Sequence, residues 1–600
     1  MLKDIEGKIL DLALVGNCSI AALIDREACI VWYCLPRFDG DPVFHKLLGA
    51  PLGRPTDGVF SIKMEDVHEV EQSYIENTAI VRTVLRGASG AVEIIDFAPR
   101  YESRGRAYRP QTLVRTIRPI SGTPRIAVLV RPSFEYGALE PEITYGSNHI
   151  RYVGPRFTVR LTTDAPIDYI LGGTTFNLHE PMNFVLGPDE SLTDSVSAFA
   201  RFEFEHTEFY WRAWVHRLAI PFEWQEAVIR AAITLKLCTY EPTGAIVAAV
   251  TTSIPEAPHS QRNWDYRYCW LRDSYFVVRA LNSLSAVRTM ENYFRWLMNV
   301  VATTNGGHIQ PVYGVGLESD LTEHIVSSLQ GYRGMWPVRR GNQAYQHFQH
   351  DSYGNVVLGA TQAFLDRRLL HQPSVIEFKL LERAGLQSME LYDKPDAGMW
   401  ELRFSAKIHT TSSLMCWAAC DRLARIAYHI GLHDRYAYWR ERAEAMQAVI
   451  LQRAWSEKRQ SFVECFEGQT LDAGVLLMAE VGFIDPKDPR FVSTLSVLEK
   501  TLGRGAFMMR YEAPDDFGPP NTAFNICAFW RVTALARSGR QEDARSIFET
   551  LLASRNHVGL MSEDIKPDTG EAWGNFPQTY SMVGIINAAR LLSSSWDVEI

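Results

Sequence analysis

The segment FEFEHTEFYWRAWVHRLAI (202–220) separates two parts of the chain that have different hydrophobic periods. Before it, short runs rich in Val, Ile, Thr and aromatic residues alternate with polar positions, a pattern typical of half-buried β-strands. After it, apolar residues recur every three or four positions, as they do on the buried face of a helix. We expect the segment itself to be partly helical and to join the two parts.

The first part, residues 1–205, is predicted to be an antiparallel β-sandwich. Its short runs are broken by Gly, Pro and Asp, which end strands and begin turns. The expected strands are AIVRTVLRG (79–87), AVEIIDFAP (91–99), QTLVRTIRP (111–119), PRIAVLVRP (124–132), RFTVRLTTD (156–164) and DYILGGTTF (168–176).

The second part, residues 223–600, is predicted to be helical, with residues 206–222 as a linker. Val228, Ala231 and Leu235 follow one another at helical spacing, and Gly539 ends one helix shortly before the next begins. Helical hairpins are therefore the expected unit, and the whole chain is a multidomain α+β protein. Similar amphipathic stretches lie at 284–303, 354–370, 410–431, 434–454, 521–538, 540–555 and 577–594.

Composition excludes several classes of protein. The 600 residues are 46% hydrophobic and carry a formal net charge of −9, so no chain-wide basic field exists to bind nucleic acid. No apolar run reaches the length of about 18 residues that a membrane helix needs, and the start does not resemble a secretory signal. The nine cysteines form no CxxC pair. We expect a cytoplasmic protein with no metal, no cofactor and no nucleic-acid or membrane partner.

The loop QRNWDYRYCWLRDSYF (261–276) combines aromatic rings with three arginines and two aspartates. This mixture suits a sugar, because rings pack on its C–H faces while Arg and Asp bind adjacent hydroxyls. A buried Arg–Asp pair at a domain junction is the alternative. The stretch 331–355 adds further Arg, Trp, Gln and Asp side chains.

Two other loops carry candidate carboxyl groups. Glu401 follows Trp400 just before a helix, and a carboxyl beside an indole has a raised pKa that suits a general acid. The alternatives for Glu401 are a helix-dipole contact and a salt bridge with Arg403. The loop 560–581 contains four acids, which are compatible with a calcium loop, a solvated turn or the second carboxylate of a glycosidase.

These loops, in this order, resemble glycoside hydrolase family 15, which contains glucoamylases, glucodextranases and trehalases. The resemblance spans nearly the whole chain and implies an N-terminal β-sandwich followed by a C-terminal (α/α)6 barrel. It is carried by ALVGNCSIAALIDREACIVWYCLPRFDGDPVF (13–44), RNWDYRYCWLRD (262–273), GYRGMWPVRRGN (331–342), GMWELR (398–403), AFWRVTALARSGRQEDA (528–544) and GNFPQTYS (574–581).

The resemblance also implies roles for single residues. Glu401 matches the general acid and Glu563 the general base, with Glu571 as the second choice for the base. Arg272 and Asp273 match the pair that grips the terminal non-reducing sugar. The remaining expected substrate contacts are Tyr266, beside the reacting carbon, and Trp270, Trp336, Trp400 and Arg403.

The implied reaction is hydrolysis with inversion, which requires the two carboxyl groups to lie about 6.5–9.5 Å apart. The leading expectation is a glucoamylase-like enzyme that releases β-glucose from the non-reducing ends of α-glucans or oligosaccharides. An α,α-trehalase is the alternative, and a catalytically silent carbohydrate-binding protein is the second. Leu402, Asn355 and Thr522 depart from the family pattern and leave the substrate open. The substrate is a small carbohydrate in each case, and a homo-oligomer is possible.

Overall fold

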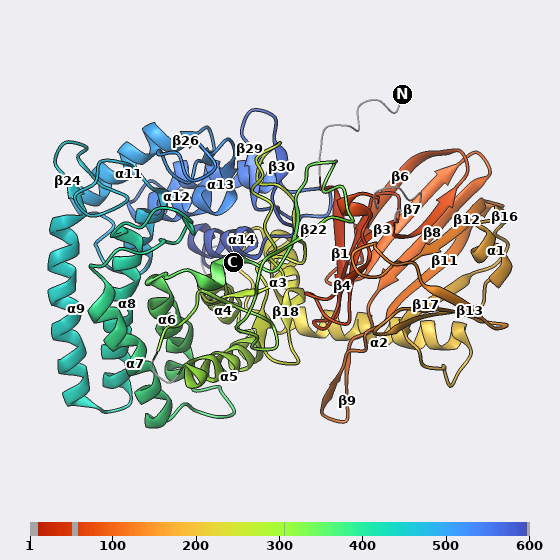
Figure 1. Ribbon diagram of the computed structural model, residues 1–600, viewed down its shortest axis with the longest axis horizontal. Helices are drawn as coiled ribbons and strands as arrows, with labels where there is room; N and C mark the ends of the chain where they lie inside the picture. The colour runs from red at the N-terminus through yellow and green to blue at the C-terminus, as the bar shows by residue number, and fades with distance from the viewer. Residues whose placement is uncertain (1–9, 51–57, 305–306, 597–600) are drawn as a thin grey trace.

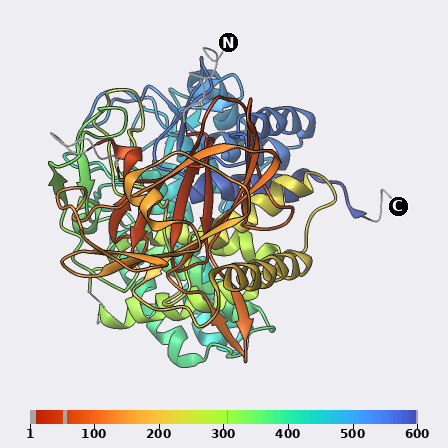
Figure 2. The same ribbon diagram turned by 90° about the vertical axis from the view of Figure 1, so that its right-hand side faces the viewer.

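The computed structural model describes residues 10–50, 58–304 and 307–596, and it consists of a sheet part and a helical part (Figure 1). Helix α2 (Val196–His216) runs along the sheet part towards the helical part. From the sandwich end, the sheets lie in front of the helices (Figure 2). The predicted fold class is confirmed, whereas the domain boundaries at 205 and 222 stay predictions.

Two antiparallel sheets make up the sandwich in the described part of the chain. One contains, in order, β1 (Leu12–Gly16), β2 (Ala21–Asp25), β3 (Ile30–Leu35), β5 (Val59–Met64), β12 (Arg125–Arg131) and β16 (Phe176–Asn177), with β4 (Asp41–Phe44) beside β3. The other contains β13 (Glu142–Tyr145), β14 (His149–Val153), β15 (Thr158–Thr163), β17 (Met182–Pro188), β11 (Leu113–Gly122), β8 (Gly90–Phe97), β7 (Val81–Gly87) and β6 (Val67–Tyr74).

The two sheets pack through aromatic rings and one buried ion pair. The ring of Phe60 on β5 lies 5.9 Å from the ring of Phe184 on β17. Arg115 on β11 pairs with Asp96 at 2.5 Å and also donates to the carbonyl of Phe60 at 3.1 Å. Because its partners are present, this charge can be buried between the sheets.

The strand prediction for 168–176 is wrong over most of its length. Residues Ile167–Gly172 form the short helix α1, and only Phe176–Asn177 pairs as a strand, β16. Pro166 precedes the helix, and Gly173 ends it in the left-handed conformation with φ of 62°. A proline before the helix and a left-handed glycine after it favour one helical turn over the strand that the β-branched and aromatic composition suggested.

The helical part is a closed ring of hairpins in which inner and outer helices alternate. Helix α14 packs against both α12 and α4, which closes the inner ring. The inner helices are α4 (Leu271–Ser283), α6 (Asp351–Leu365), α8 (Thr410–His429), α10 (Leu477–Glu480), α12 (Asn525–Arg537) and α14 (Thr579–Leu592). The outer helices are α3 (Gln225–Leu237), α5 (Val287–Thr303), α7 (Val375–Leu391), α9 (His433–Arg453), α11 (Pro489–Leu502) and α13 (Gln541–Ala553).

The extent of burial explains why some helices can be recognised from their amphipathic period and others cannot. Outer helix α9 buries one stripe, Trp439, Ala443, Met446 and Ile450, so its amphipathic period is readable. Inner helix α14 is buried on nearly all sides and is mostly apolar, so it shows no clear amphipathic period. The predicted stretches overlap seven of these helices, and the spacing of Val228, Ala231 and Leu235 predicts an eighth, α3. The helices α4, α7, α10 and α11 are not predicted.

The sandwich supports the loop that carries the main sequence motif. Arg267 and Asp265 are fully buried and pair at 2.7 Å, and Arg267 also donates to Gly40 and to the hydroxyl of Tyr136 in the sandwich. A buried Arg–Asp pair at a domain junction is therefore present in this loop, although it is not the pair Arg272–Asp273. Among the described residues, no helix has the length and apolar character needed to cross a membrane.

Candidate active site

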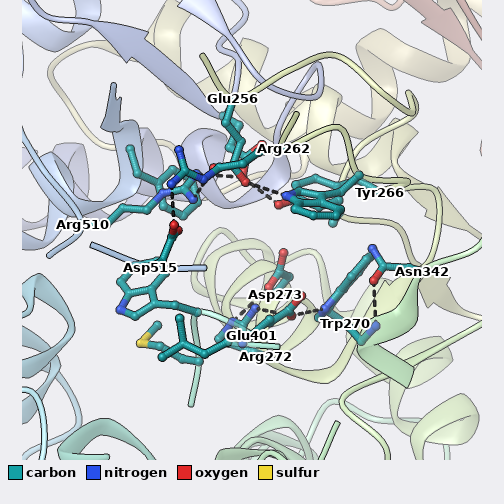
Figure 3. A pocket seen from close by; sticks show the side chains of 18 of the residues that line it. Glu256, Arg262, Tyr266, Trp270, Arg272, Asp273, Asn342, Glu401, Arg510 and Asp515 are labelled. Carbon is teal, nitrogen blue, oxygen red and sulfur yellow. Dashed lines mark hydrogen bonds and ion pairs between the residues drawn. The ribbon is translucent and has the colours of Figure 1, made fainter. Parts of the chain in front are cut away.

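A pocket with about 870 Å³ of empty space, part of it open to solvent, lies where several inner helices begin. The start of α4, the residue before α12 and the start of α14 all line it, as does the loop ahead of α8. The lining includes Glu256, Arg262, Trp264, Tyr266, Trp270, Arg272, Asp273, Trp400, Glu401, Leu402, Arg403, Arg510, Asp515, Asp516, Phe517, Glu563 and Tyr580. In Figure 3, Glu401, Arg272 and Asp273 lie across the pocket from Arg510 and Glu256.

Glu401 is held by groups from the first motif loop. The indole nitrogen of Trp270 donates to Oε1 of Glu401 at 2.6 Å, and a guanidinium nitrogen of Arg272 lies 3.4 Å from the same oxygen. The Glu401 side chain is 22% exposed, so it can reach a bound substrate. Its backbone has a φ of 63°, a left-handed conformation that a non-glycine residue adopts only where its surroundings impose it.

The expected neighbours of Glu401 need two corrections. The indole beside its carboxyl belongs to Trp270, whereas the indole nitrogen of Trp400 donates to Asp472 at 2.6 Å. Its ion-pair partner is Arg272, whereas Arg403 pairs with Glu323 at 3.0 Å. Adjacent residues in this irregular loop point in different directions, so neighbours in sequence are not neighbours in space.

Glu563 lies just before strand β29 (Asp564–Lys566) and is only 2% exposed. Its Oε1 accepts hydrogen bonds from the Tyr266 hydroxyl at 2.8 Å and from Arg510 at 3.1 Å. Its Oε2 has no hydrogen-bond partner within the described residues. One oxygen is thus fixed by two donors, and the other is left to accept a proton from a water molecule or a substrate.

Arg510 is the positive centre of a cluster of three carboxyl groups. Its two terminal nitrogens lie 2.7 Å from Glu256, 2.8 Å from Asp564 and 3.1 Å from Glu563. Burial, together with the negative charges of Glu256 and Asp564, raises the pKa of Glu563 well above its usual range. Burial likewise raises the pKa of Asp564 to about 8. The hydrogen bonds from Tyr266 and Arg510 favour the ionised form of Glu563 and oppose this shift.

Arg272 and Asp273 lie on the floor of the pocket at the start of α4. Nε of Arg272 is 3.4 Å from Asp273, and a terminal nitrogen is 3.7 Å from Asp351. Asp273 is 6% exposed, and burial raises its pKa to about 6. Fork-shaped guanidinium and carboxylate groups at the floor suit the binding of neighbouring hydroxyls on one sugar ring.

Two of the candidates do not line this pocket. Trp336 is 52% exposed and lies outside the lining, so its role as a substrate contact stays a prediction. Glu571 pairs with Arg333 at 3.4 Å and accepts from the indole of Trp573. Of the two candidates for the base, the structure therefore brings Glu563 to the pocket and not Glu571.

The three departures from the family pattern lie in or beside the pocket. Leu402 lines it, next to Glu401. Asn355 donates to Asp351 at 3.0 Å, in the group around Arg272. Thr522 donates to the backbone carbonyl of Glu256 at 2.8 Å, in the group around Arg510.

Several pocket residues were missed in the sequence. Glu256, Arg510, Asp515 and Asp516 belong to segments without a recognisable motif, and only the folded chain brings them to the pocket. Trp264 lies inside the motif RNWDYRYCWLRD and could have been found from its place there.

Comparison with known proteins decides the family. A family model described as glycosyl hydrolases family 15 matches residues 224–590. The chain belongs to glycosyl hydrolase family 15. It is therefore a glycoside hydrolase, and its substrate is a carbohydrate. A model described as trehalase-like, N-terminal, matches residues 5–174, which include the first strands of the sandwich.

Similar proteins include a trehalase from Mycolicibacterium smegmatis, which is 30% identical over 97% of this chain and 90% of that protein. A trehalase from Thermoplasma volcanium is 29% identical over 98% of this chain and 95% of that protein. A bacterial glucoamylase crystallised with acarbose matches the structure with a TM-score of 0.66 at 13% identity, covering 98% of this chain and 94% of that one. At that identity the last match supports the fold only.

Proposed function

We propose that this family 15 hydrolase is an inverting α,α-trehalase with Glu401 as general acid and Glu563 as general base. The observation that carries the proposal is that both carboxyl groups line one pocket and are held by separate sets of donors. Trp270 and Arg272 hold Glu401, whereas Tyr266 and Arg510 hold Glu563.

We favour trehalose as the substrate over the α-glucans expected from the sequence, for one reason. Full-length relatives at about 30% identity carry the name trehalase, while the glucoamylase likeness extends only to the fold. Glucoamylase activity on maltotriose is therefore the alternative hypothesis that the experiment must exclude.

In the proposed reaction, Glu401 donates a proton to the glycosidic oxygen as the bond from that oxygen to the anomeric carbon breaks. Glu563 takes a proton from the water molecule whose oxygen attacks the same carbon from the opposite face. Arg272 and Asp273 hold the ring that is attacked. Inversion requires room for this water, so we expect the two carboxyl groups to lie about 6.5–9.5 Å apart in the complex.

Time-resolved proton NMR with trehalose, maltotriose and isomaltotriose tests the proposal. We expect trehalose to disappear and to yield α-glucose and β-glucose in equal initial amounts, one from the leaving group and one from the attacked ring. Early β-glucose from maltotriose, with trehalose intact, would instead establish a glucoamylase. If all three sugars stay intact beside an active control enzyme, a silent carbohydrate-binding protein is the better description.

A further inference from the structure

A tight turn, residues 515–518, is hydrogen-bonded to two different loops at the mouth of the pocket. Asp515 and Gly518 close the turn with reciprocal backbone hydrogen bonds of 3.1 Å. Arg262 donates to Asp515 at 2.6 Å and to the carbonyl of Gly518 at 2.9 Å. The Tyr511 hydroxyl donates to Asp515 at 2.6 Å. The turn is therefore fixed to the loop that precedes α4.

The same turn is fixed to the loop that carries Glu401. The backbone nitrogen of Arg403, two residues after Glu401, donates to the carboxylate of Asp516 at 2.5 Å. The Arg403 guanidinium binds Glu323 at 3.0 Å and Gln343 at 2.8 Å. These contacts hold the side chain of Arg403 in place as well as its backbone.

Trp264 is enclosed by these groups. The guanidinium of Arg403 lies 4.3 Å from the centre of the Trp264 ring, and the Phe517 ring meets that indole edge-on at 5.4 Å. The Trp264 indole nitrogen donates to Glu256 at 3.0 Å. The Arg339 guanidinium also lies over this ring, 5.1 Å from its centre, so the indole is held rigidly as part of the pocket wall.

Exposure distinguishes the floor of the pocket from its mouth. Asp273, Glu563 and Tyr580 are between 2% and 6% exposed, whereas Phe517 is 36% exposed. Under the proposed function, the attacked ring lies on the floor against Arg272. The leaving ring then lies beyond Glu401, on the side of Trp264 and Phe517.

We infer that Trp264, Arg403 and the 515–518 turn form a specificity-determining wall that admits one sugar ring on the leaving-group side. A further sugar attached to that ring would have to pass the Phe517 side chain. The wall would therefore select a disaccharide and reject its extended forms. This inference rests on the proposed function, because it needs Glu401 at the glycosidic oxygen.

The test compares kcat/KM for trehalose with kcat/KM for a trisaccharide in which one ring of trehalose carries an additional α-glucosyl group. We expect the wild-type enzyme to prefer trehalose by at least about tenfold. Phe517→Ala should reduce that preference about tenfold, and Phe517→Leu should have an intermediate effect. Both variants keep the carboxylates that hold the turn, and thermal denaturation checks their folding.

Phe404→Ala is the matched control, because Phe404 is 85% exposed on the loop of Glu401 and does not line the pocket. This variant should keep the wild-type preference. The proposed wall would be contradicted if Phe517→Ala kept the wild-type ratio of kcat/KM values. It would also be contradicted if the wild-type enzyme used trehalose and the trisaccharide equally well. Failure of the wild-type enzyme to cleave trehalose would instead overturn the proposed function.

Discussion

The hydroxyl of Tyr266 donates a hydrogen bond of 2.8 Å to Oε1 of Glu563, although the two residues are 297 positions apart. This bond joins the motif loop before α4 to the loop before α14. It favours the ionised form of a carboxyl group whose pKa burial raises. The proposed general base therefore depends on a partner that is distant in the sequence but lies in the same pocket.

Tyr266→Phe should move the acidic limb of the kcat/KM profile to higher pH. The substitution removes a hydrogen bond that lowers the pKa of Glu563, so the base becomes ionised only at higher pH. A hydrogen bond to a charged group contributes about 1.5–3 kcal/mol, which corresponds to roughly one to two pH units. The pH dependence of kcat/KM on trehalose measures the shift.

Glu256→Gln serves as a control, because it should shift the acidic limb of the kcat/KM profile in the opposite direction. The negative charge of Glu256 raises the pKa of Glu563, so its removal should move the acidic limb to lower pH. Shifts in the same direction for both variants would contradict the proposed electrostatics of the cluster.

Glu401→Gln should lower kcat by roughly 10²- to 10⁴-fold, because proton donation by a general acid contributes about that factor. The amide keeps the shape of the side chain and still fits beside Trp270, so trehalose should bind. Stopped assays give kcat, and calorimetric titration with trehalose gives the affinity. A variant that loses binding as completely as catalysis would show that Glu401 holds the substrate and does not act on it.

Glu563→Gln and Glu571→Gln distinguish the two candidates for the base. Glu563 lines the pocket and Glu571 does not, so only the first variant should lose activity, by at least about a hundredfold. The ratio of the two kcat values with trehalose is the measurement. The reverse order of activities would assign the base to Glu571.

Glu241 makes a buried ionic contact between the sandwich and the helical part. Arg100 and Lys236 each lie 2.7 Å from its carboxylate. Burial opposes the ionisation of Glu241, but these two positive charges outweigh it and hold its pKa well below the usual range. The contribution to stability is therefore present above the unfolded-state pKa of about 4.3 and declines as the pH falls below it.

Glu241→Gln should lower the free energy of unfolding by about 3–5 kcal/mol at pH 7, because it leaves two buried cations without their carboxylate. Urea denaturation of both proteins at pH 7 and at pH 3.5 or below measures the effect, and the difference between them should be smaller at the lower pH. A difference that grows on acidification would contradict the assigned direction of the pKa.

Parts of the fold and of the site were predictable because their signals are local. The half-buried strand Val81–Gly87 and the amphipathic helix His433–Arg453 each bury one face, so the period of the sequence identifies them. Helix α4 escaped prediction because its first turn belongs to the motif expected to be a loop and carries the polar residues Arg272 and Asp273. Helix α1 escaped because a nearby proline and glycine outweigh the apparent β-propensity of its residues.

The sequence by itself indicated the two hydrophobic periods, the family, and the carboxyl candidates Glu401, Glu563 and Glu571, because each signal lies in short contiguous stretches of residues. Only the tertiary structure decided that Trp270 and not Trp400 contacts Glu401, that Arg510 joins three carboxyl groups, and that Trp336 lies outside the pocket. These relations depend on closure of the helical ring, which brings distant loops to one end of the barrel. No local pattern along the chain carries that information.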